Sequence, residues 1–253
     1  MKRFLCLVGI ITLLILSCFA IFKISETKNY VYSREKLAIN YSEGLDHNKL
    51  LAQNIKLEDN KGTLINIVAD FSAASNKIVI ITPPKEGYVP GKKYKLFIDS
   101  NIKFDVEGKT VKNKVFDFIA KKEEEISFPD KNLDNAVRSQ INKKNGVIYK
   151  SEIYKLFSLN GENYNIIDLR GIENFTNIRV LSLSNNAIKN IDEIKNLKQL
   201  EHLALTNNKI SDIAALKNLK KLKTLWLSGN SIKDYSPVKS YFDKLTAKDF
   251  KIK

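Results

Sequence analysis

The chain has 253 residues, of which 43% are hydrophobic and 28% charged, so it can hold one large domain or two or three small ones with proper cores. Its formal net charge is +14, and its two cysteines, Cys6 and Cys18, both fall in the first 18 residues. The rest of the chain therefore cannot form an internal disulfide or a thiolate metal site.

The N-terminal segment is apolar. Residues 4–22 contain no charge and follow Lys2 and Arg3. We predict that residues 1–24 are a signal peptide or membrane anchor and not part of a fold. At ~1.5 Å per helical residue the segment approaches the ~30 Å thickness of the hydrocarbon layer, which would suit an uncleaved anchor.

The stretch "LILSC", ending at Cys18, resembles a bacterial lipobox. The resemblance implies cleavage and lipid attachment at Cys18. An uncleaved helix and simple secretion remain open beside it, because Leu16 is bulkier than a lipobox prefers. All three readings place the bulk of the chain outside the cytoplasm, and the first two anchor it to the cell membrane. The abundance of Lys, Asn and Ile is typical of a low-GC Gram-positive bacterium.

Residues 30–121 form short alternating segments separated by turn formers such as "EDNKG" and "YVPGKK". This pattern predicts a β-sandwich. The stretch "KIVIITPPKEGYVPGKKYKLFI" is similar to bacterial Ig-like domains of cell-surface and S-layer-associated proteins, in which T-P-P and then G-Y-x-P-G-K-x-Y-x-L-x-I occur. The resemblance implies a spacer. The matching residues are Thr82, Pro83, Pro84, Gly87, Tyr88, Pro90, Gly91, Tyr94, Leu96 and Ile98.

Residues 122–158 are predicted to form a helical cap. Asp130 can cap a helix whose apolar face includes Leu133 and Val137, and Ser151 can cap a second helix. A solenoid needs such a cover because its first turn would otherwise expose the end of the core.

Residues 159–245 repeat with a period of 22 over four turns. Leucines recur at 159, 181, 203 and 225, asparagines at 186, 208 and 230, and isoleucines at 166, 188, 210 and 232. This is the leucine-rich repeat pattern, which predicts one short strand per turn in a parallel sheet. We expect the asparagines to satisfy the backbone where each strand ends. Residues 246–253 are left as a C-terminal tail.

Cap and repeats together resemble those of internalin-like proteins. The match includes Phe128, Pro129 and Asp130 in the cap, and "SPV" at 236–238 resembles the S-P-L of their 22-residue units. The first turn departs from the pattern, with Gly161 and Tyr164 in place of leucine and asparagine. The array is also shorter than in adhesive members, so their receptor specificity is not carried over.

The fold class predicted is therefore multidomain: an Ig-like β-sandwich, a short α-helical cap and a leucine-rich repeat solenoid. On each repeat strand the side chains alternate, so Trp226 must face outward between the inward Leu225 and Leu227. An exposed tryptophan on a concave sheet is typical of a binding anchor. We predict a protein or peptide partner held by Trp226 with His202, Val180 and Thr224 around it. Alternatively, residues 245–250 fold back and cover the ring.

No HExxH, GxSxG or glycine-rich phosphate loop occurs, and the two histidines are far apart, so we predict no enzyme activity, cofactor or metal. Nucleic-acid binding is also not expected of an exported chain. The function predicted is noncovalent binding of another protein by an anchored repeat domain held on a spacer. The alternative is a structural envelope component that contacts anionic wall polymer or lipid through distributed lysines.

Overall fold

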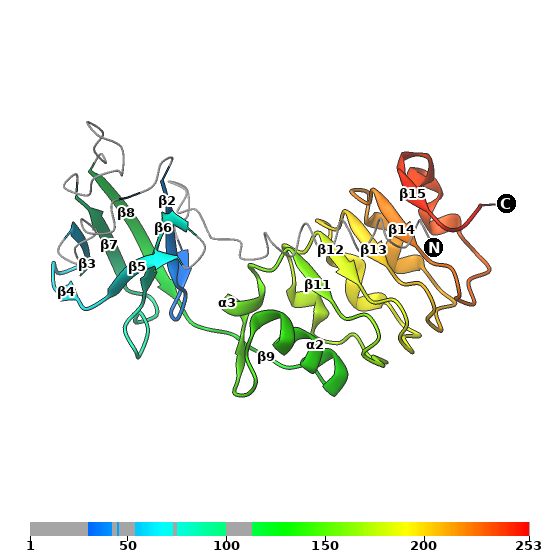
Figure 1. Cartoon of the computed structure of the whole chain (residues 1–253), viewed down its shortest axis with the longest axis horizontal. Coiled ribbons are helices and arrows are strands. Elements are labelled where there is room, and N and C mark those ends of the chain that lie inside the picture. Colours follow the sequence, from blue (N-terminus) through cyan, green and yellow to red (C-terminus); the bar gives the residue numbers. More distant parts are fainter. Residues whose placement is uncertain (1–29, 42–44, 46–53, 73–74, 100–112, 253) are drawn as a thin grey trace. The chain divides into compact units, whose positions relative to one another are not determined.

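The computed structural model describes residues 30–41, 45, 54–72, 75–99 and 113–252 (Figure 1). The chain divides into two compact units, with the boundary between Glu124 and Glu125. The predicted signal or anchor segment and Cys18 lie outside the described residues. In the part of the chain that is described, no helix has the length and apolar character needed to cross a membrane.

The first unit consists of two β-sheets. A five-stranded sheet has the order β1-β8-β7-β3-β4, and a three-stranded sheet has the order β2-β6-β5. Neighbouring strands are antiparallel except β1 and β8, which run parallel. The strands are β1 (Tyr30–Tyr32), β2 (Leu37–Asn40), β3 (Ile55–Asp59), β4 (Leu64–Ile65), β5 (Val68–Ser72), β6 (Ser75–Thr82), β7 (Lys93–Ile98) and β8 (Lys114–Lys121).

One hydrophobic core is shared by the strands of both sheets. In β7 the alternate residues Tyr94, Leu96 and Ile98 are buried, as expected of a strand with one face inward. Tyr94 stacks on Phe118 with ring centroids 5.4 Å apart, and its hydroxyl accepts a hydrogen bond from the Val89 N–H at 2.9 Å. Four of the motif residues thus have structural roles in the core, namely Tyr88, Tyr94, Leu96 and Ile98.

The second unit begins with β9 (Glu125–Ile126), which pairs with β10 (Ile148–Tyr149), and contains the helix α2 (Lys131–Ile141) between them. Asp130 is the N-cap of α2, and its carboxylate accepts the N–H groups of Asn132 and Leu133. The second carboxylate oxygen accepts the N–H groups of Ile167 and Asp168, so one side chain joins the helix to the first repeat.

The second helix, α3 (Lys150–Ile153), starts earlier than predicted. Ser151 lies inside its first turn and is not the cap. The Tyr149 N–H at the start of α3 is instead bound by the Glu152 carboxylate at 2.8 Å. A glutamate that reaches back to the first residue of a helix can replace a capping hydroxyl.

The repeats form a five-stranded parallel sheet in chain order. The strands are β11 (Ser158–Asn160), β12 (Val180–Ser182), β13 (His202–Ala204), β14 (Thr224–Trp226) and β15 (Ala247–Lys248). The strand pairs of β11 to β14 are all displaced by 22 residues, as predicted. The period in the sequence predicts four turns, whereas the structure adds a fifth strand, β15, in the segment left as a tail.

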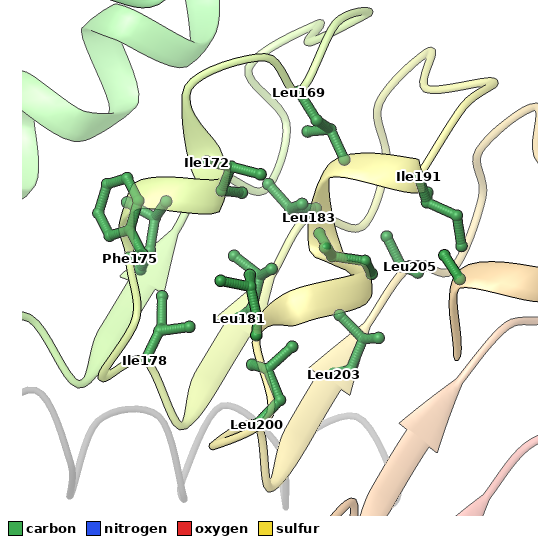
Figure 2. Packing of buried hydrophobic residues seen from close by; sticks show 14 of the residues in the cluster. Leu169, Ile172, Phe175, Ile178, Leu181, Leu183, Ile191, Leu200, Leu203 and Leu205 are labelled. Atoms are coloured by element: carbon green, nitrogen blue, oxygen red, sulfur yellow. The ribbon is translucent and has the colours of Figure 1, made fainter. Parts of the chain in front are cut away.

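Each repeat returns through a 3-10 element. These elements are η3 (Ile172–Asn174), η4 (Asp192–Asn196), η5 (Ala214–Asn218) and η6 (Ser236–Lys244). Leucines from the strands and isoleucines from the return segments fill one continuous core, and Figure 2 shows part of it, including Leu181, Leu203, Ile172 and Ile191. The buried leucines explain why the period appears so clearly in the sequence.

The predicted asparagine ladder is confirmed. Asn208 accepts the Ile188 N–H at 3.1 Å and donates to the carbonyls of Leu183 and Leu205 at 2.9 and 3.0 Å. Asn186 and Asn230 make the same bonds one repeat earlier and later. Each amide therefore joins two repeats by satisfying backbone groups of both.

A second ladder lies just before the first, at positions with positive φ. Asn185 and Asn207 have φ of 58° and 54°, and Gly229 takes the same place with φ 72°. Asn207 donates to the Asn185 side chain at 2.8 Å, and Asn185 donates to the Glu162 carboxylate at 3.1 Å. Asparagine and glycine are the residues that tolerate this left-handed conformation best.

A third column precedes the 3-10 elements and was not predicted. Asp168, Asn190, Asp212 and Asp234 are spaced by 22, and each side chain accepts the backbone N–H two residues further on, at 2.7 to 2.9 Å. Such turns satisfy donors that the short helical elements leave unpaired. The column could have been found from its period, because it contains only Asp and Asn.

Candidate functional site

The candidate site is the outer sheet face, defined as the side of β11 to β15 whose side chains do not belong to the core. The strand register arranges its residues in two rows across the sheet. The first row is Ser158, Val180, His202, Thr224 and Ala247. The second row is Asn160, Ser182, Ala204 and Trp226.

The four site residues predicted from sequence therefore lie together on this face. Val180, His202 and Thr224 are successive members of the first row, and Trp226 lies two residues beyond Thr224 on β14. The inward neighbours Leu181, Leu203 and Leu225 are in the core. Successive side chains of a strand point to opposite faces, which places the four site residues outward and the leucines in the core.

Two of these four side chains are buried although they lie on the outward side of their strands. Val180 and Thr224 are only 5% and 6% exposed, whereas His202 and Trp226 are partly buried. Thr224 is enclosed because His202 bonds it from one side and β15 adds Ala247 on the other. The surface available for contact is thus concentrated on His202 and Trp226.

His202 is held by its neighbour in the first row. Its Nδ1 lies 3.0 Å from the Thr224 hydroxyl. Burial lowers the pKa of His202, and the nearby Glu201 carboxylate opposes this effect only in part. The imidazole is therefore neutral at pH 7, and it is suited to exchange hydrogen bonds but not to act as a cation. Among the described residues, no group of three or more His, Cys, Asp or Glu side chains is placed to hold a metal ion.

Trp226 has a polar atom without a partner. Its indole Nε1 is buried and forms no hydrogen bond with the described residues, and the same is true of the Ser182 hydroxyl. Both belong to the second row, separated by Ala204, so they are ~10 Å apart at ~4.8 Å per strand. An unpaired buried donor costs about 1–3 kcal/mol, and an outside acceptor could reach this one only after the indole ring turns, because Nε1 has no exposed surface of its own.

The C-terminal tail lies beside Trp226 in the sheet. Asp249 follows β15, and its carboxylate accepts the N–H groups of Leu227 and Ser228 at 2.7 and 3.0 Å. The ring contacts of the tail go to other residues: Phe250 stacks on Tyr235 at 4.9 Å and meets Phe242 edge-on at 5.7 Å. The role of Asp249 was not foreseen, since nothing in its local sequence indicates a strand partner.

A charged column borders the face where the strands begin. Glu201 forms ion pairs with Arg179 on the preceding repeat, at 3.7 Å, and with Lys223 on the following one. Arg179 also lies over the ring of Phe157, 5.4 Å from its centroid, and Phe157 is 38% exposed. The column alternates in sign, with two basic side chains around one carboxylate, so it carries a net charge of only +1.

A family model described as "Leucine Rich repeats (2 copies)" matches residues 176–218 and 198–240. No curated protein matches the chain. The comparison with known sequences therefore concerns the repeat region of the second unit.

Among solved structures, the chain is similar to the internalin InlF of Listeria monocytogenes, with 32% identity over 48% of this chain and a TM-score of 0.47. It is similar to a leucine-rich repeat protein of Leptospira interrogans, with 30% identity over 39% of this chain and a TM-score of 0.33. It is also similar to the N-terminal part of the bacterial S-layer protein SbsC, with 16% identity over 40% of this chain and a TM-score of 0.32. The chain spans 36%, 27% and 24% of the lengths of these three proteins.

Proposed function

Residues 176–240 are leucine-rich repeats, and on this premise we propose that the chain is a cell-surface protein whose outer sheet face binds a peptide segment of another protein noncovalently. Repeats of this kind commonly use their extended sheet surface for binding. The match covers well under half of each of the similar proteins, so the identity of the partner is not carried over from them.

The observation that carries the proposal is the unpaired indole Nε1 of Trp226 on a face that presents few other large side chains. A partly buried tryptophan contributes apolar area and one directed donor, which is the combination found at binding hot spots. A peptide backbone offers carbonyl acceptors at regular intervals. A peptide carbonyl is therefore the simplest group to pair with this donor.

The small area of the face favours a peptide over a folded surface. Five strands at ~4.8 Å, each about three residues long at ~3.3 Å per residue, give a face on the order of 200 Å². A stable interface between folded proteins takes ~800 Å² on each side. The proposed anchor is Trp226, with His202 as a neutral polar contact. Val180 and Thr224, being buried, support these two from within the sheet.

The remaining parts are proposed to hold this face away from the membrane. The two sheets of residues 30–121 share one core, which is consistent with an Ig-like sandwich acting as a spacer. Residues 122–158 would cap the array, since Leu133, Ala136 and Val137 of α2 belong to the same core as the repeats. Residues 1–24, with lipid at Cys18 or as an uncleaved helix, would provide the anchor in the membrane.

The experiment begins with a peptide library selected against the immobilised full chain. The selected peptide is then titrated while the fluorescence of Trp226, the only tryptophan, is recorded. Trp226→Ala should weaken binding by about 2 kcal/mol or more, roughly 30-fold. Trp226→Phe keeps a ring but loses the N–H, so it should weaken binding by about 1 kcal/mol.

The matched control is Phe157→Ala, which removes an exposed ring outside the two rows. It should leave the affinity unchanged. Selected peptides that bind wild type and Trp226→Ala equally, or that leave the wild-type fluorescence unaltered, would show that the partner binds elsewhere.

A further inference from the structure

Five lysines form a strip across the 3-10 elements, which we call the lysine strip. Lys195, Lys217 and Lys239 are each the fourth residue of η4, η5 and η6, spaced by 22 residues. Lys198 and Lys220 repeat this spacing three residues later. All five side chains are exposed, and η4, η5 and η6 are packed side by side in sequence order. The strip therefore runs along the repeat axis.

These lysines are not paired with a carboxylate. In the described ranges, none of the five takes part in an ion pair or a side-chain hydrogen bond. The column at the start of the strands provides a comparison within the same repeats, because there Glu201 sits between Arg179 and Lys223 and pairs with both. One column thus alternates in sign, while the lysine strip places like charges on three successive turns, where they repel one another.

A negatively charged column lies at the opposite end of the same 3-10 elements. Asp212 and Asp234 precede η5 and η6, and each binds a backbone N–H. Hydrogen bonds from the backbone and side chain of Ser236 lower the pKa of Asp234, so its charge persists at mildly acidic pH. At η4 the equivalent position is the neutral Asn190, and exposed Asp192, two residues later, is the first residue of the element. The lysine strip is consequently narrow and bounded by carboxylates.

The first repeat does not continue the strip. Its equivalent of Lys195 is Glu173, whose carboxylate accepts the Gly171 N–H at 2.8 Å. The strip therefore starts at the second repeat and continues to η6, a length of three turns. This restriction distinguishes it from lysines scattered evenly over a solvated surface.

We propose that the lysine strip binds a linear phosphate polyanion, a polymer with one phosphate in each short repeating unit, aligned with the repeat axis. Successive repeats are ~4.8 Å apart at the sheet, so lysines of successive turns follow one another at short, regular intervals along the repeat axis. An anionic membrane is a plane and would meet the Asp column together with the lysines. A single polymer chain can follow the lysines alone. The strip is formed by the 3-10 elements, so this inference goes beyond the peptide site on the outer sheet face.

The test uses the full chain in mild detergent and a biotinylated inorganic polyphosphate as the probe. Binding is measured at salt concentrations from about 50 to about 200 mM, because the dependence on salt counts the phosphates contacted. The strip variant is Lys195→Gln with Lys217→Gln and Lys239→Gln. The control variant is Lys61→Gln with Lys85→Gln and Lys131→Gln, which removes the same charge from exposed lysines elsewhere.

The strip variant should bind polyphosphate at least about 10-fold more weakly than wild type, and its slope of log K against log salt should fall by about 2, at ~0.7 per contact. The control variant should change the affinity less than about 3-fold. Trp226→Ala should leave polyphosphate binding unchanged. Polyphosphate binding by the lysine strip is therefore tested independently of peptide binding at Trp226. Melting temperatures of both variants should match wild type, since all six side chains are exposed.

Three results would overturn the proposal. The first is equal weakening by the strip and control variants, which would mean that net charge alone is responsible. The second is the absence of wild-type binding at the lowest salt. The third is binding to vesicles of roughly 30% phosphatidylglycerol in phosphatidylcholine that is as tight as polyphosphate binding and is lost in the same strip variant, which would assign the strip to a membrane surface.

Discussion

Asp249 accepts the Leu227 N–H at 2.7 Å, in the place that a carbonyl of the next repeat fills for every earlier strand. The equivalent N–H groups of Leu183 and Leu205 donate to Ala204 and Trp226 carbonyls at 2.8 and 2.9 Å. A side-chain carboxylate thus closes the last full repeat of the sheet. Because Asp249 also binds the Ser228 N–H, it satisfies two backbone donors at the end of the array.

Asp249→Ala should lower the free energy of unfolding by about 2–3 kcal/mol, because two backbone donors lose an ionised acceptor. Urea denaturation followed by the fluorescence of Trp226 measures the effect at the strand concerned. Asp243→Ala is the control, since Asp243 is exposed in the same C-terminal segment and should change stability by less than about 0.5 kcal/mol. Equal effects of the two variants would argue against the closing role of Asp249.

Asn208→Ala should destabilise the repeats by about 2–4 kcal/mol. The buried amide is bonded to Ile188, Leu183 and Leu205, and an alanine leaves these backbone groups unpaired. Asn218→Ala removes an exposed amide from η5 and serves as the matched control. Thermal unfolding monitored by circular dichroism distinguishes them, and a melting temperature of Asn208→Ala close to that of Asn218→Ala would contradict the ladder.

Asp130→Asn should destabilise the second unit in a pH-dependent way. Burial alone would raise the pKa of Asp130, but four backbone N–H donors outweigh it and hold the pKa below the usual value. A lowered pKa stabilises the fold at pH above the unfolded value of ~3.9, and this contribution is lost as pH falls through the folded pKa. The stability difference between wild type and variant should thus be constant above about pH 5 and shrink below about pH 4.

The measurement is urea denaturation of both proteins at a series of pH values. Asp134→Asn is a useful comparison, because Asp134 on the same helix pairs with Arg138 at the surface and binds no backbone donors of the repeats. A difference between wild type and Asp130→Asn that stays constant down to the most acidic pH would show that the carboxylate charge is not what matters.

His202 should titrate below the usual histidine pKa of ~6.5, because burial is the main cause of its lowered pKa. The folded state then binds a proton less readily than the unfolded chain, so this group favours folding at neutral pH and its contribution falls as pH drops below the unfolded pKa. The chemical shift of the His202 ring proton against pH gives the midpoint. Thr224→Val removes the hydrogen bond and should leave the midpoint lowered, and a return to the ordinary value would mean that the hydrogen bond, not burial, sets it.

Much of the repeat unit could be predicted from sequence because buried residues and period coincide. Leu181, Leu203 and Leu225 recur because each strand must bury the same position, and Asn208 recurs because each turn leaves the same groups unpaired. The outward placement of Trp226 followed from the same alternation. A repeating constraint is visible in one sequence, since the chain supplies its own alignment.

The features that could not be predicted lie where the repeat pattern ends, or where the burial of a side chain depends on neighbouring strands. Asp249 and β15 interrupt the period, so nothing in the sequence linked them to Leu227. The burial of Val180 and Thr224 depends on adjacent strands, whereas the sequence pattern gives only the direction in which a side chain points. Residue type alone predicts Ser151 as the cap of α3, but the Glu152 carboxylate binds the Tyr149 N–H at the start of the helix because it reaches back to it.

Gly229 marks the end of the second asparagine ladder. A Cβ at this position would lie 2.1 Å from the Asn207 side-chain oxygen, which occupies the space the glycine leaves open. The second ladder therefore begins at Glu162 and ends at Asn207, because Gly229 has no side-chain amide to continue it. Duplication of an internal unit such as residues 187–208 would lengthen the solenoid with its ladder intact. A unit added beyond Gly229 would have to start a new ladder, so the ladder stays continuous only when the added unit lies within the array.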